Sequence, residues 1–434
     1  MPNYLITGNR KLKGTITTNT SKNAAVVLLN AALLNKGKTV LKNVPKIEEV
    51  NRIIEVLESI GTEVSWTGKK DVTIIPPTKL DLSKINYQSA IKTRSVLFLL
   101  GVLIHRKKKF QVPQPGGCRL GKRTVKPHLF ALENFGIKIK TLRKHYQVTA
   151  NKLRPNKNLV LYESGDTVTE NAILAAALIP GKTVIKFASA NYQVQDLCYF
   201  LIKLGVKIEG ISSTTLEIQG VKSINKTVSY NISEDPIESM LFLSIAATTN
   251  SSLTIKRCPI NFLELELLKL EKMGFKYKIL RQYKAKNGFS NLVDIKTFKS
   301  DLVALEEKIE PRPYPGLNID NLPFFVPIAT QAKGTTYIFD WVYEERAINF
   351  IELNKLGAKV TLVDSHRAFI TGPTKLRATE IVCPPSLRPS TIIIVAMLAA
   401  SGQSILRNVY SIERGYEDLP NRLVKIGAKI KKID

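Results

Sequence analysis

One glycine-rich segment carries the residue types best suited to proton transfer. Residues 115–123 read Pro-Gly-Gly-Cys-Arg-Leu-Gly-Lys-Arg, so the thiol of Cys118 lies beside the cations Arg119, Lys122 and Arg123. Neighbouring cations favour a thiolate and bring a thiol towards the working pH, where it can give or take a proton. Because Gly-Gly-Cys-Arg is not a core pattern, we expect a reactive loop thiol. The other cysteines lie among apolar residues and should be inert: Cys198, Cys258 and Cys383.

Cations at the starts of predicted helices are candidates for binding anions. Ser21-Lys-Asn-Ala-Ala opens an apolar helix and puts Lys22 and Asn23 where backbone N–H groups and the helix dipole favour an anion. The alternative is an ordinary cap with a solvated lysine. Arginine suits carboxylate and phosphate, although a single arginine is more often solvated or salt-bridged. Four arginines lie at loop-to-helix junctions: Arg94, Arg346, Arg388 and Arg414.

One carboxylate completes the set of candidate groups. Asp320 ends the Pro/Gly-rich stretch Pro313-Tyr-Pro-Gly-Leu-Asn-Ile-Asp ahead of a predicted helix, so it is either a helix cap or a catalytic group. The sequence has no Walker loop, no GxGxxG, no Ser/His/Asp order and no metal-ligand cluster. We therefore expect an α/β protein that binds anionic ligands without a metal or a cofactor.

Composition and cysteine use indicate the compartment. Hydrophobic residues make up 44% and charged residues 23% of the 434 residues, as in ordinary globular proteins. The longest apolar stretches, such as 95–104, fall well short of the roughly 20 residues of a membrane span, and the start shows no secretory signal. Four scattered cysteines indicate a reducing compartment. We expect a cytoplasmic protein with no membrane partner.

The charge of +28, from 64 Lys+Arg against 36 Asp+Glu, raises the possibility of nucleic-acid binding. The densest basic run, 106–109, is only four residues long. No RNP-like string, GxxG clamp or Cys/His finger accompanies it. We therefore expect lysines spread over the surface, a local positive excess only at a cleft between two globules, and no specific nucleic-acid partner.

A sixfold repeat organises the chain. A helix ending in an apolar residue and glycine, followed by a short alternating strand, recurs at intervals of about 70 residues. Each glycine should end its helix with a positive φ. A 70-residue unit buries too little surface alone, so we expect two globules of three repeats, with the most apolar helices (24–34, 172–178 and 392–400) buried, sheets outside, and a boundary near 229–235. The glycines are Gly61, Gly136, Gly205, Gly274, Gly357 and Gly427.

Six segments in this order along the whole chain resemble the UDP-N-acetylglucosamine 1-carboxyvinyltransferase family of enolpyruvyl transferases. The thiol-bearing loop is the most specific of them. The resemblance implies a two-domain inside-out α/β barrel of six repeats, three per domain, with a ligand cleft between the domains. It places the domains at 21–232 and at 1–20 plus 233–434. The segments are Ser21-Lys-Asn-Ala-Ala, 115–123, Asn318-Ile-Asp, Glu345-Arg, Leu387-Arg and Arg414-Gly-Tyr-Glu.

The resemblance also implies a reaction. The family transfers the enolpyruvyl group of phosphoenolpyruvate to the 3-hydroxyl of UDP-N-acetylglucosamine by addition and elimination, the first committed step of peptidoglycan precursor synthesis. Cys118 resembles the family's loop acid, and Asp320 the group that handles the sugar hydroxyl proton. The anion-binding set is Lys22, Arg123, Arg346, Arg388 and Arg414. The other substrate contacts implied are Asn23, Arg94, Thr124, Val125, Lys126, Pro127 and Val342.

The chain departs from the family pattern mainly on the nucleotide side. Lys126 replaces an Asp that meets the uracil, and Ser386 replaces an Asp before Leu-Arg. Asn191 and Gln193 stand where acidic residues are usual, Pro236 occupies an Arg position, and the loop from Gly165 is altered. Two alternatives stay open: the sister enzyme acting on shikimate 3-phosphate, which lacks the Gly-Gly-Cys loop, and a diverged relative with altered acceptor specificity or a non-catalytic binding role. Oligomeric state is not predicted.

Overall fold

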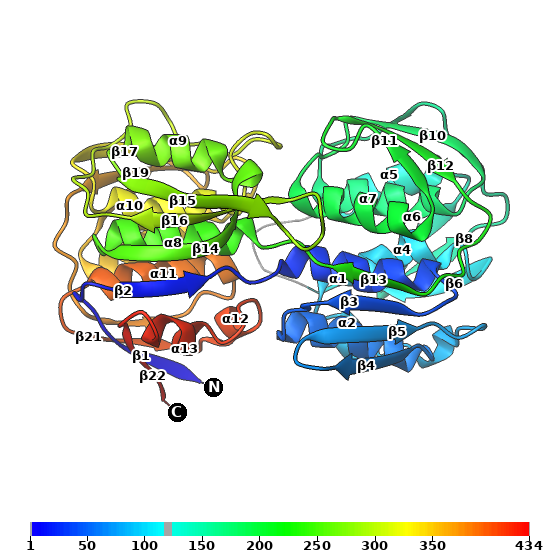
Figure 1. Ribbon diagram of the computed structural model, residues 1–434, viewed down its shortest axis with the longest axis horizontal. Helices are drawn as coiled ribbons and strands as arrows, with labels where there is room; N and C mark the ends of the chain where they lie inside the picture. The colour runs from blue at the N-terminus through cyan, green and yellow to red at the C-terminus, as the bar shows by residue number, and fades with distance from the viewer. Residues whose placement is uncertain (1, 117–123, 434) are drawn as a thin grey trace. The chain divides into compact units, whose positions relative to one another are not determined.

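The described residues form six small β-sheets, three in each of two compact units (Figure 1). The computed structural model describes residues 2–116 and 124–433. The first unit consists of residues 20–116 and 124–233, and the second of residues 2–19 and 234–433. Among the described residues, no helix combines the length and apolar character that crossing a bilayer requires. Cys118 and Arg123 lie outside the described residues.

The first unit surrounds apolar helices with three sheets. Helices α1 (Lys22–Ala31), α4 (Phe98–Leu103) and α6 (Asp166–Ala177) are almost wholly buried, and α4 packs on both of the others. Helices α2 (Glu48–Ser59), α5 (Lys126–Glu133) and α7 (Tyr192–Leu204) complete the unit, with the short α3 (Tyr87–Ala90). The sheets are β13 (Val228–Asn231)–β3 (Thr39–Lys42)–β5 (Asp71–Ile75)–β4 (Glu63–Thr67), β6 (Lys109–Pro113)–β8 (His145–Thr149)–β7 (Lys138–Thr141), and β11 (Lys207–Glu209)–β12 (Thr215–Gly220)–β10 (Gly181–Lys186)–β9 (Leu159–Val160).

The second unit repeats this plan. Helices α8 (Pro236–Thr248), α10 (Phe325–Ala329) and α11 (Leu387–Ala399) pack against one another inside it (Figure 1), and α9 (Glu264–Lys272), α12 (Tyr410–Glu413) and α13 (Leu419–Val424) flank the sheets. The sheets are β20 (Glu380–Val382)–β21 (Gln403–Arg407)–β1 (Asn3–Thr7)–β22 (Lys429–Ile433), β15 (Tyr277–Lys284)–β16 (Asn291–Thr297)–β14 (Ser252–Pro259)–β2 (Lys13–Thr17), and β17 (Gly334–Phe339)–β19 (Arg367–Gly372)–β18 (Lys359–Leu362).

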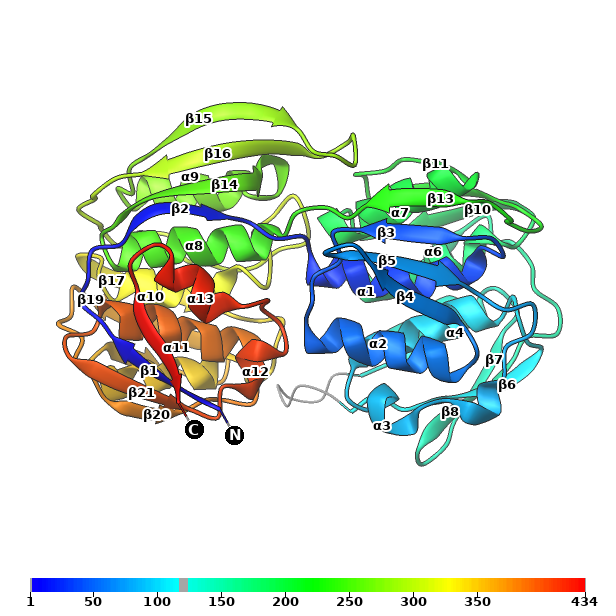
Figure 2. The same cartoon turned by 60° about the horizontal axis from the view of Figure 1, so that its bottom comes forward.

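The two N-terminal strands find partners far away in the sequence. Strand β1 lies antiparallel between β21 and β22, and β2 runs parallel to β14 (Figure 2). Strand β22, which follows Gly427, therefore pairs with a strand from the start of the chain. The prediction of buried apolar helices is also confirmed, because α1, α6 and α11 expose almost none of their apolar side chains.

All six repeat glycines have a positive φ, between 81° and 101°, which confirms the prediction made from their spacing. Two of them differ in their surroundings and provide a test. A Cβ added at Gly274 would lie 2.8 Å from the carbonyl oxygen of Asp301, whereas one added at Gly427 would meet nothing within 4 Å. We expect Gly427→Ala to cost about 1 kcal/mol, from the left-handed backbone alone, and Gly274→Ala to cost about 3 kcal/mol. Urea denaturation followed by circular dichroism measures both, and equal shifts would contradict the packing argument.

Candidate functional site

The start of α1 ties two predicted substrate contacts to other elements of the first unit. Ser21 caps the helix, since its hydroxyl accepts from the backbone N–H of Ala24 at 3.2 Å. The ammonium of Lys22 lies 2.8 Å from Oε2 of Glu49 on α2. The amide of Asn23 donates to the hydroxyl of Tyr192 at 3.1 Å. The sequence had left open a helix cap or an anion site, and the cap is provided by Ser21 itself, which leaves Lys22 and Asn23 for side-chain contacts.

Glu49 connects Lys22 to the segment that carries Arg94. Its Oε1 accepts from the hydroxyls of Thr93 and Ser95 at 3.2 and 3.3 Å. Arg94 in turn donates to the carbonyl oxygen of Thr124 at 3.0 Å. The carboxylate of Glu49 thus pairs with Lys22 and accepts hydrogen bonds from the side chains on both sides of Arg94. Sequence reasoning missed Glu49, because an acidic residue in the first turn of an amphipathic helix is ordinary.

Residues 124–127 begin α5 directly after the segment that the structure does not describe. The hydroxyl of Thr124 accepts from the backbone N–H of Lys126 at 3.2 Å, which fixes the turn into the helix. Thr124 and Lys126 are exposed, Val125 is half-buried and Pro127 is buried. The exposed members are therefore accessible to a ligand, as the resemblance requires of substrate contacts.

Asn191 has a structural role that the sequence did not reveal. Its Oδ1 accepts from the backbone N–H of Tyr192 at 2.9 Å and caps α7. Its Nδ2 donates to Oδ2 of Asp166 at 2.9 Å, and Ser189 donates to the other oxygen of Asp166 at 2.5 Å. The amide therefore supplies a donor to a carboxylate, which an acidic side chain at this position could not do at neutral pH.

This contact predicts a pH-dependent stability for Asn191→Asp. The change would place two carboxylates about 3 Å apart, and their repulsion would raise the pKa of the pair in the folded state. A folded-state pKa above the unfolded value means stability that is present at low pH and lost as pH rises through the folded pKa. We expect Asn191→Asp to be destabilised by about 2 kcal/mol at pH 8 and much less at pH 4. Thermal denaturation against pH, with Asn191→Ala as the uncharged control, measures the difference; a pH-independent loss would contradict it.

A buried carboxyl group and a buried amide lie close to this segment. Burial raises the pKa of Glu170 on α6 well above its usual range, and the charges of Asp166 and Asp196 add to that effect. Neither Oε atom of Glu170 nor Oε1 of Gln193 has a hydrogen-bond partner in the described part of the chain. Burial therefore disfavours the ionised form of Glu170.

In the second unit, Asp320 lies between two predicted anion-binding arginines. Its Oδ2 accepts from Nη2 of Arg388 at 3.3 Å, and its Oδ1 is 3.6 Å from Nη1 of Arg346. Asp320 sits in the turn before a 3-10 helix (Leu322–Phe324) that leads into α10, and its backbone N–H donates to Oδ1 of Asn318. The side chain of Asp320 faces these two cations.

Arg346 is fixed by a buried carboxylate. Nε and Nη2 donate to the two oxygens of Asp340 at 2.5 and 2.9 Å, Nη2 also donates to the carbonyl oxygen of Ile319, and the guanidinium lies over the ring of Tyr343. Burial alone would lower the pKa of Arg346, but the charge and hydrogen bonds of Asp340 raise it above its ordinary value. This geometry turns Nη1 towards Asp320.

Arg388 on α11 is fixed by different partners. Nη1 donates to the hydroxyl of Tyr416 at 2.6 Å, and burial raises the pKa of that phenol. Asp235, which caps α8, interacts electrostatically with Arg388. Burial raises the pKa of Asp235 to about 6, and Arg388 opposes that rise. Sequence reasoning missed Asp235, Asp340 and Tyr416.

Two predicted residues of the second unit stand apart from this cluster. Arg414 follows α12, and its buried Nε has no hydrogen-bond partner among residues 2–116 and 124–433. Val342 is 37% exposed after β17, where it is available for an apolar contact. None of the hydrogen bonds and ion pairs found among the described residues joins either of them to Asp320.

The cluster of Arg346, Asp320 and Arg388 can perform two tasks. Asp320 places its carboxylate oxygens against the two guanidiniums, and a carboxylate can accept a proton from a bound hydroxyl. The same guanidiniums have the fork geometry that binds carboxylate and phosphate. The first unit has cations of its own in Lys22 and Arg94. Within the described ranges, no group of three or more His, Cys, Asp or Glu could hold a metal ion.

Comparisons with known proteins identify the family of the chain. The family model described as EPSP synthase (3-phosphoshikimate 1-carboxyvinyltransferase) matches residues 6–423. Relatives named UDP-N-acetylglucosamine 1-carboxyvinyltransferase are 35% identical in Borreliella burgdorferi and 36% identical in Treponema denticola, over 99–100% of this chain and 99% of each relative. Among solved structures, the enolpyruvyl transferase NikO from Streptomyces tendae has a TM-score of 0.85 at 23% identity, covering 100% of this chain and 99% of NikO. EPSP synthase from Acinetobacter baumannii has a TM-score of 0.78 at 19% identity, covering both chains in full; at these identities the two likenesses show the fold alone.

Proposed function

This chain belongs to the EPSP synthase family of enolpyruvyl transferases, and we propose that it transfers the enolpyruvyl group of phosphoenolpyruvate to the 3-hydroxyl of UDP-N-acetylglucosamine. The observation that carries the proposal is the full-length identity of 31–36% to relatives that bear this activity in their names. The resemblance seen in the sequence motifs is thereby confirmed. The reaction releases phosphate and would be the first committed step of peptidoglycan precursor synthesis in the cytoplasm.

We propose further that the architecture is an inside-out α/β barrel of six repeats, with domains at 21–232 and at 1–20 plus 233–434. Three sheets in each unit and six glycines with positive φ support the repeat. The changes of unit between residues 19 and 20 and between residues 233 and 234 support the domain limits.

The residues divide the chemistry between them. Asp320 takes the proton of the sugar 3-hydroxyl, and the hydroxyl oxygen bonds to C2 of phosphoenolpyruvate. Cys118 protonates C3, and the product of this addition is a tetrahedral intermediate. Loss of a proton from C3 with departure of phosphate then restores the double bond. Lys22, Arg123, Arg346, Arg388 and Arg414 neutralise the phosphate and carboxylate. Asn23, Arg94, Val342 and residues 124–127 contact the substrates.

The hydrogen bonds of the described residues support these roles where they can be seen. The two oxygens of Asp320 face Arg388 and Arg346. Arg346 and Arg388 each have a second anchor, Asp340 and Tyr416, that leaves one edge of the guanidinium directed at Asp320. A base held in this way needs no reorganisation when the hydroxyl arrives.

A phosphate-release assay tests the function. Phosphoenolpyruvate with UDP-N-acetylglucosamine should release phosphate, and phosphoenolpyruvate with shikimate 3-phosphate should not. Release with shikimate 3-phosphate alone would overturn the proposal in favour of the sister activity. The altered residues Lys126, Asn191 and Gln193 favour one variation, a changed affinity for the nucleotide, which would appear as a raised KM for UDP-N-acetylglucosamine with kcat little affected.

A further inference from the structure

One sheet differs from the other five in the way its charge is balanced. In each of the other five, a cation of a strand pairs with an acidic residue of the same sheet or of its turn. The sheet β6–β8–β7 has no such pair among the described residues, and neither 104–116 nor 137–150 contains Asp or Glu. The five pairs are Lys42–Asp71, Lys182–Glu217, Arg281–Asp294, Arg367–Asp364 and Arg407–Glu380.

The register of this sheet gathers lysines on its outer face. Lys109 lies beside Thr149, and Thr149 beside Lys138, so one row across the three strands carries two cations. The next row on the same face places Lys140 in line with two glutamines, Gln147 and Gln111. The alternate residues face inward and are mostly buried, including Phe110, Val112, Tyr146 and Val148. The sheet forms one edge of the first unit in Figure 2.

We call the exposed cations of this sheet and its turns the basic face: Lys108, Lys109, Lys138, Lys140, Arg143 and Lys144. None of the six has an ion pair within the described part of the chain. Strand spacing and the two-residue repeat put neighbouring charges about 7–10 Å apart, close to the Debye length of about 8 Å at physiological salt. Their fields therefore add, and their mutual repulsion opposes folding until an anion approaches.

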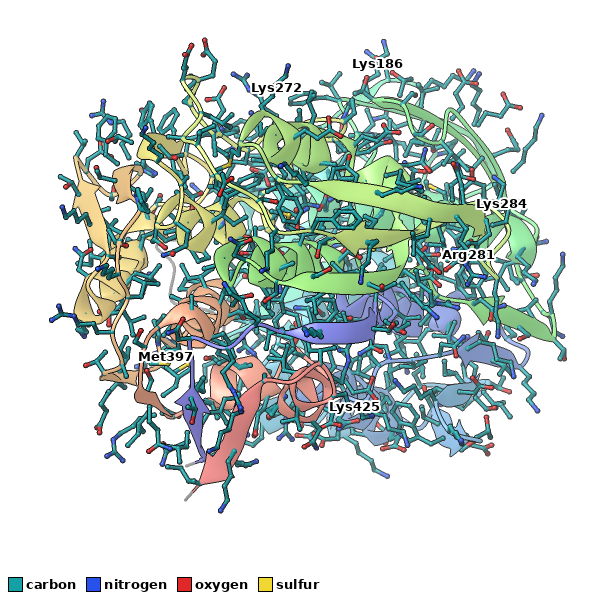
Figure 3. All side chains as sticks on the ribbon, turned by 60° about the vertical axis from the view of Figure 1, so that its left-hand side comes forward. Lys186, Lys272, Arg281, Lys284, Met397 and Lys425 are labelled. Atoms are coloured by element: carbon teal, nitrogen blue, oxygen red, sulfur yellow. The ribbon has the colours of Figure 1, made fainter. Side chains whose placement is uncertain are left out.

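Exposed lysines also occur in the second unit, among them Lys272 on α9, Lys284 on β15 and Lys425 directly after α13 (Figure 3). The basic face differs from the other five sheets because no acidic residue of its own sheet or turns offsets any of its six cations in the described part of the chain.

The side chains of the basic face discriminate among anionic partners. Lysine is depleted from the cores of protein–protein interfaces, which argues against a protein. Single-stranded nucleic acid is bound by stacking on aromatic side chains, but Phe110 and Tyr146 are buried. Duplex grooves admit a helix or a ribbon, not a flat three-stranded face. A planar array of anions fits best.

The turn between β7 and β8 adds an apolar contact. Leu142 is 38% exposed and is followed directly by Arg143 and Lys144. An apolar side chain flanked by cations is the arrangement that interfacial segments use at lipid headgroups. Two backbone hydrogen bonds hold the turn: the N–H of Leu142 donates to the carbonyl oxygen of His145, and the N–H of Gln114 donates to the carbonyl oxygen of Lys144.

We propose that the basic face binds the surface of an anionic lipid bilayer, with its ammonium groups at the headgroup phosphates and Leu142 in the interface. The contact is peripheral and reversible and needs no spanning helix. It is independent of the proposed enolpyruvyl transfer, and it departs from the sequence-based expectation of no membrane partner.

Vesicle sedimentation with the full chain tests the proposal. Phosphatidylcholine vesicles with and without 30% phosphatidylglycerol are compared at 0.15 M salt, for the parent and two triple variants. The test variant carries Lys109→Gln, Lys138→Gln and Lys140→Gln. The matched control carries Lys359→Gln, Lys429→Gln and Lys431→Gln, three exposed lysines of β18 and β22 that make the same change in net charge.

We expect the parent to sediment with anionic vesicles only. Each lysine near an anionic surface contributes roughly fivefold to partitioning, so the test variant should bind on the order of 100-fold more weakly and the control within about threefold of the parent. Leu142→Ser should weaken binding without altering its salt dependence. Equal losses in both triple variants, no binding by the parent, or binding to duplex nucleic acid but not to vesicles would each overturn the proposal.

Discussion

Replacing Cys118 by serine should abolish turnover, whereas replacing it by aspartate should preserve it. The addition step needs a proton on the vinyl carbon of phosphoenolpyruvate, and an alkanol is far too weak an acid to supply it. A carboxyl group can supply it. We expect Cys118→Ser to lose at least a thousandfold in kcat, or about 4 kcal/mol of transition-state stabilisation, and Cys118→Asp to stay within about tenfold of the parent. Phosphate release under saturating substrates measures both.

Covalent labelling separates the acid role from the nucleophilic one. A small epoxide mimic of phosphoenolpyruvate should label the parent at Cys118 and leave both variants unmodified. The other three thiols serve as internal controls, since Cys198, Cys258 and Cys383 are buried and burial raises the pKa of each thiol. Labelling of any of them, or parental turnover by Cys118→Ser, would remove the loop thiol from the mechanism.

The repeat was predictable from sequence because its signals are local. A glycine that ends a helix and an alternating strand after it occupy fewer than ten residues, and the six copies confirm one another. The partner of β1 was not predictable in the same way, because β21 and β22 lie about 400 residues away and no periodicity identifies them. Only the resemblance placed the first 20 residues with the C-terminal half.

The candidate site was likewise predictable only in part. Arginines at helix starts can be chosen by residue type, and Arg346 and Arg388 do lie on either side of Asp320. The residues that hold these two arginines in place cannot be identified by residue type. Asp340 is one acidic residue among 36, and Tyr416 is one tyrosine among 14; each becomes recognisable only when the fold brings it to a guanidinium. Glu49 is hidden for the same reason, since its partners Thr93 and Ser95 belong to another element.

Asp320→Asn should separate binding from catalysis in the second unit. The amide keeps the size of the side chain but cannot accept the hydroxyl proton, so kcat should fall about a thousandfold. The change also removes a negative charge from between Arg346 and Arg388, which raises the positive potential at the proposed phosphoenolpyruvate site. The KM for phosphoenolpyruvate should therefore stay equal or fall, and folding should change by no more than about 1 kcal/mol because Asp320 is partly exposed.

Asp340→Asn provides the matched control, since it is the same substitution at the other carboxylate of Arg346. Asp340 is fully buried and bonds Arg346 through two nitrogens, so its loss leaves an uncompensated buried cation and should cost about 3–5 kcal/mol of stability. Urea denaturation and steady-state kinetics on both variants give the answer. If Asp320 is the base, its variant is folded and inactive with phosphoenolpyruvate still bound, while the Asp340 variant is mainly unstable. If instead Asp320→Asn raises KM with kcat unchanged, Asp320 only positions the two arginines, and another group must accept the proton of the sugar hydroxyl.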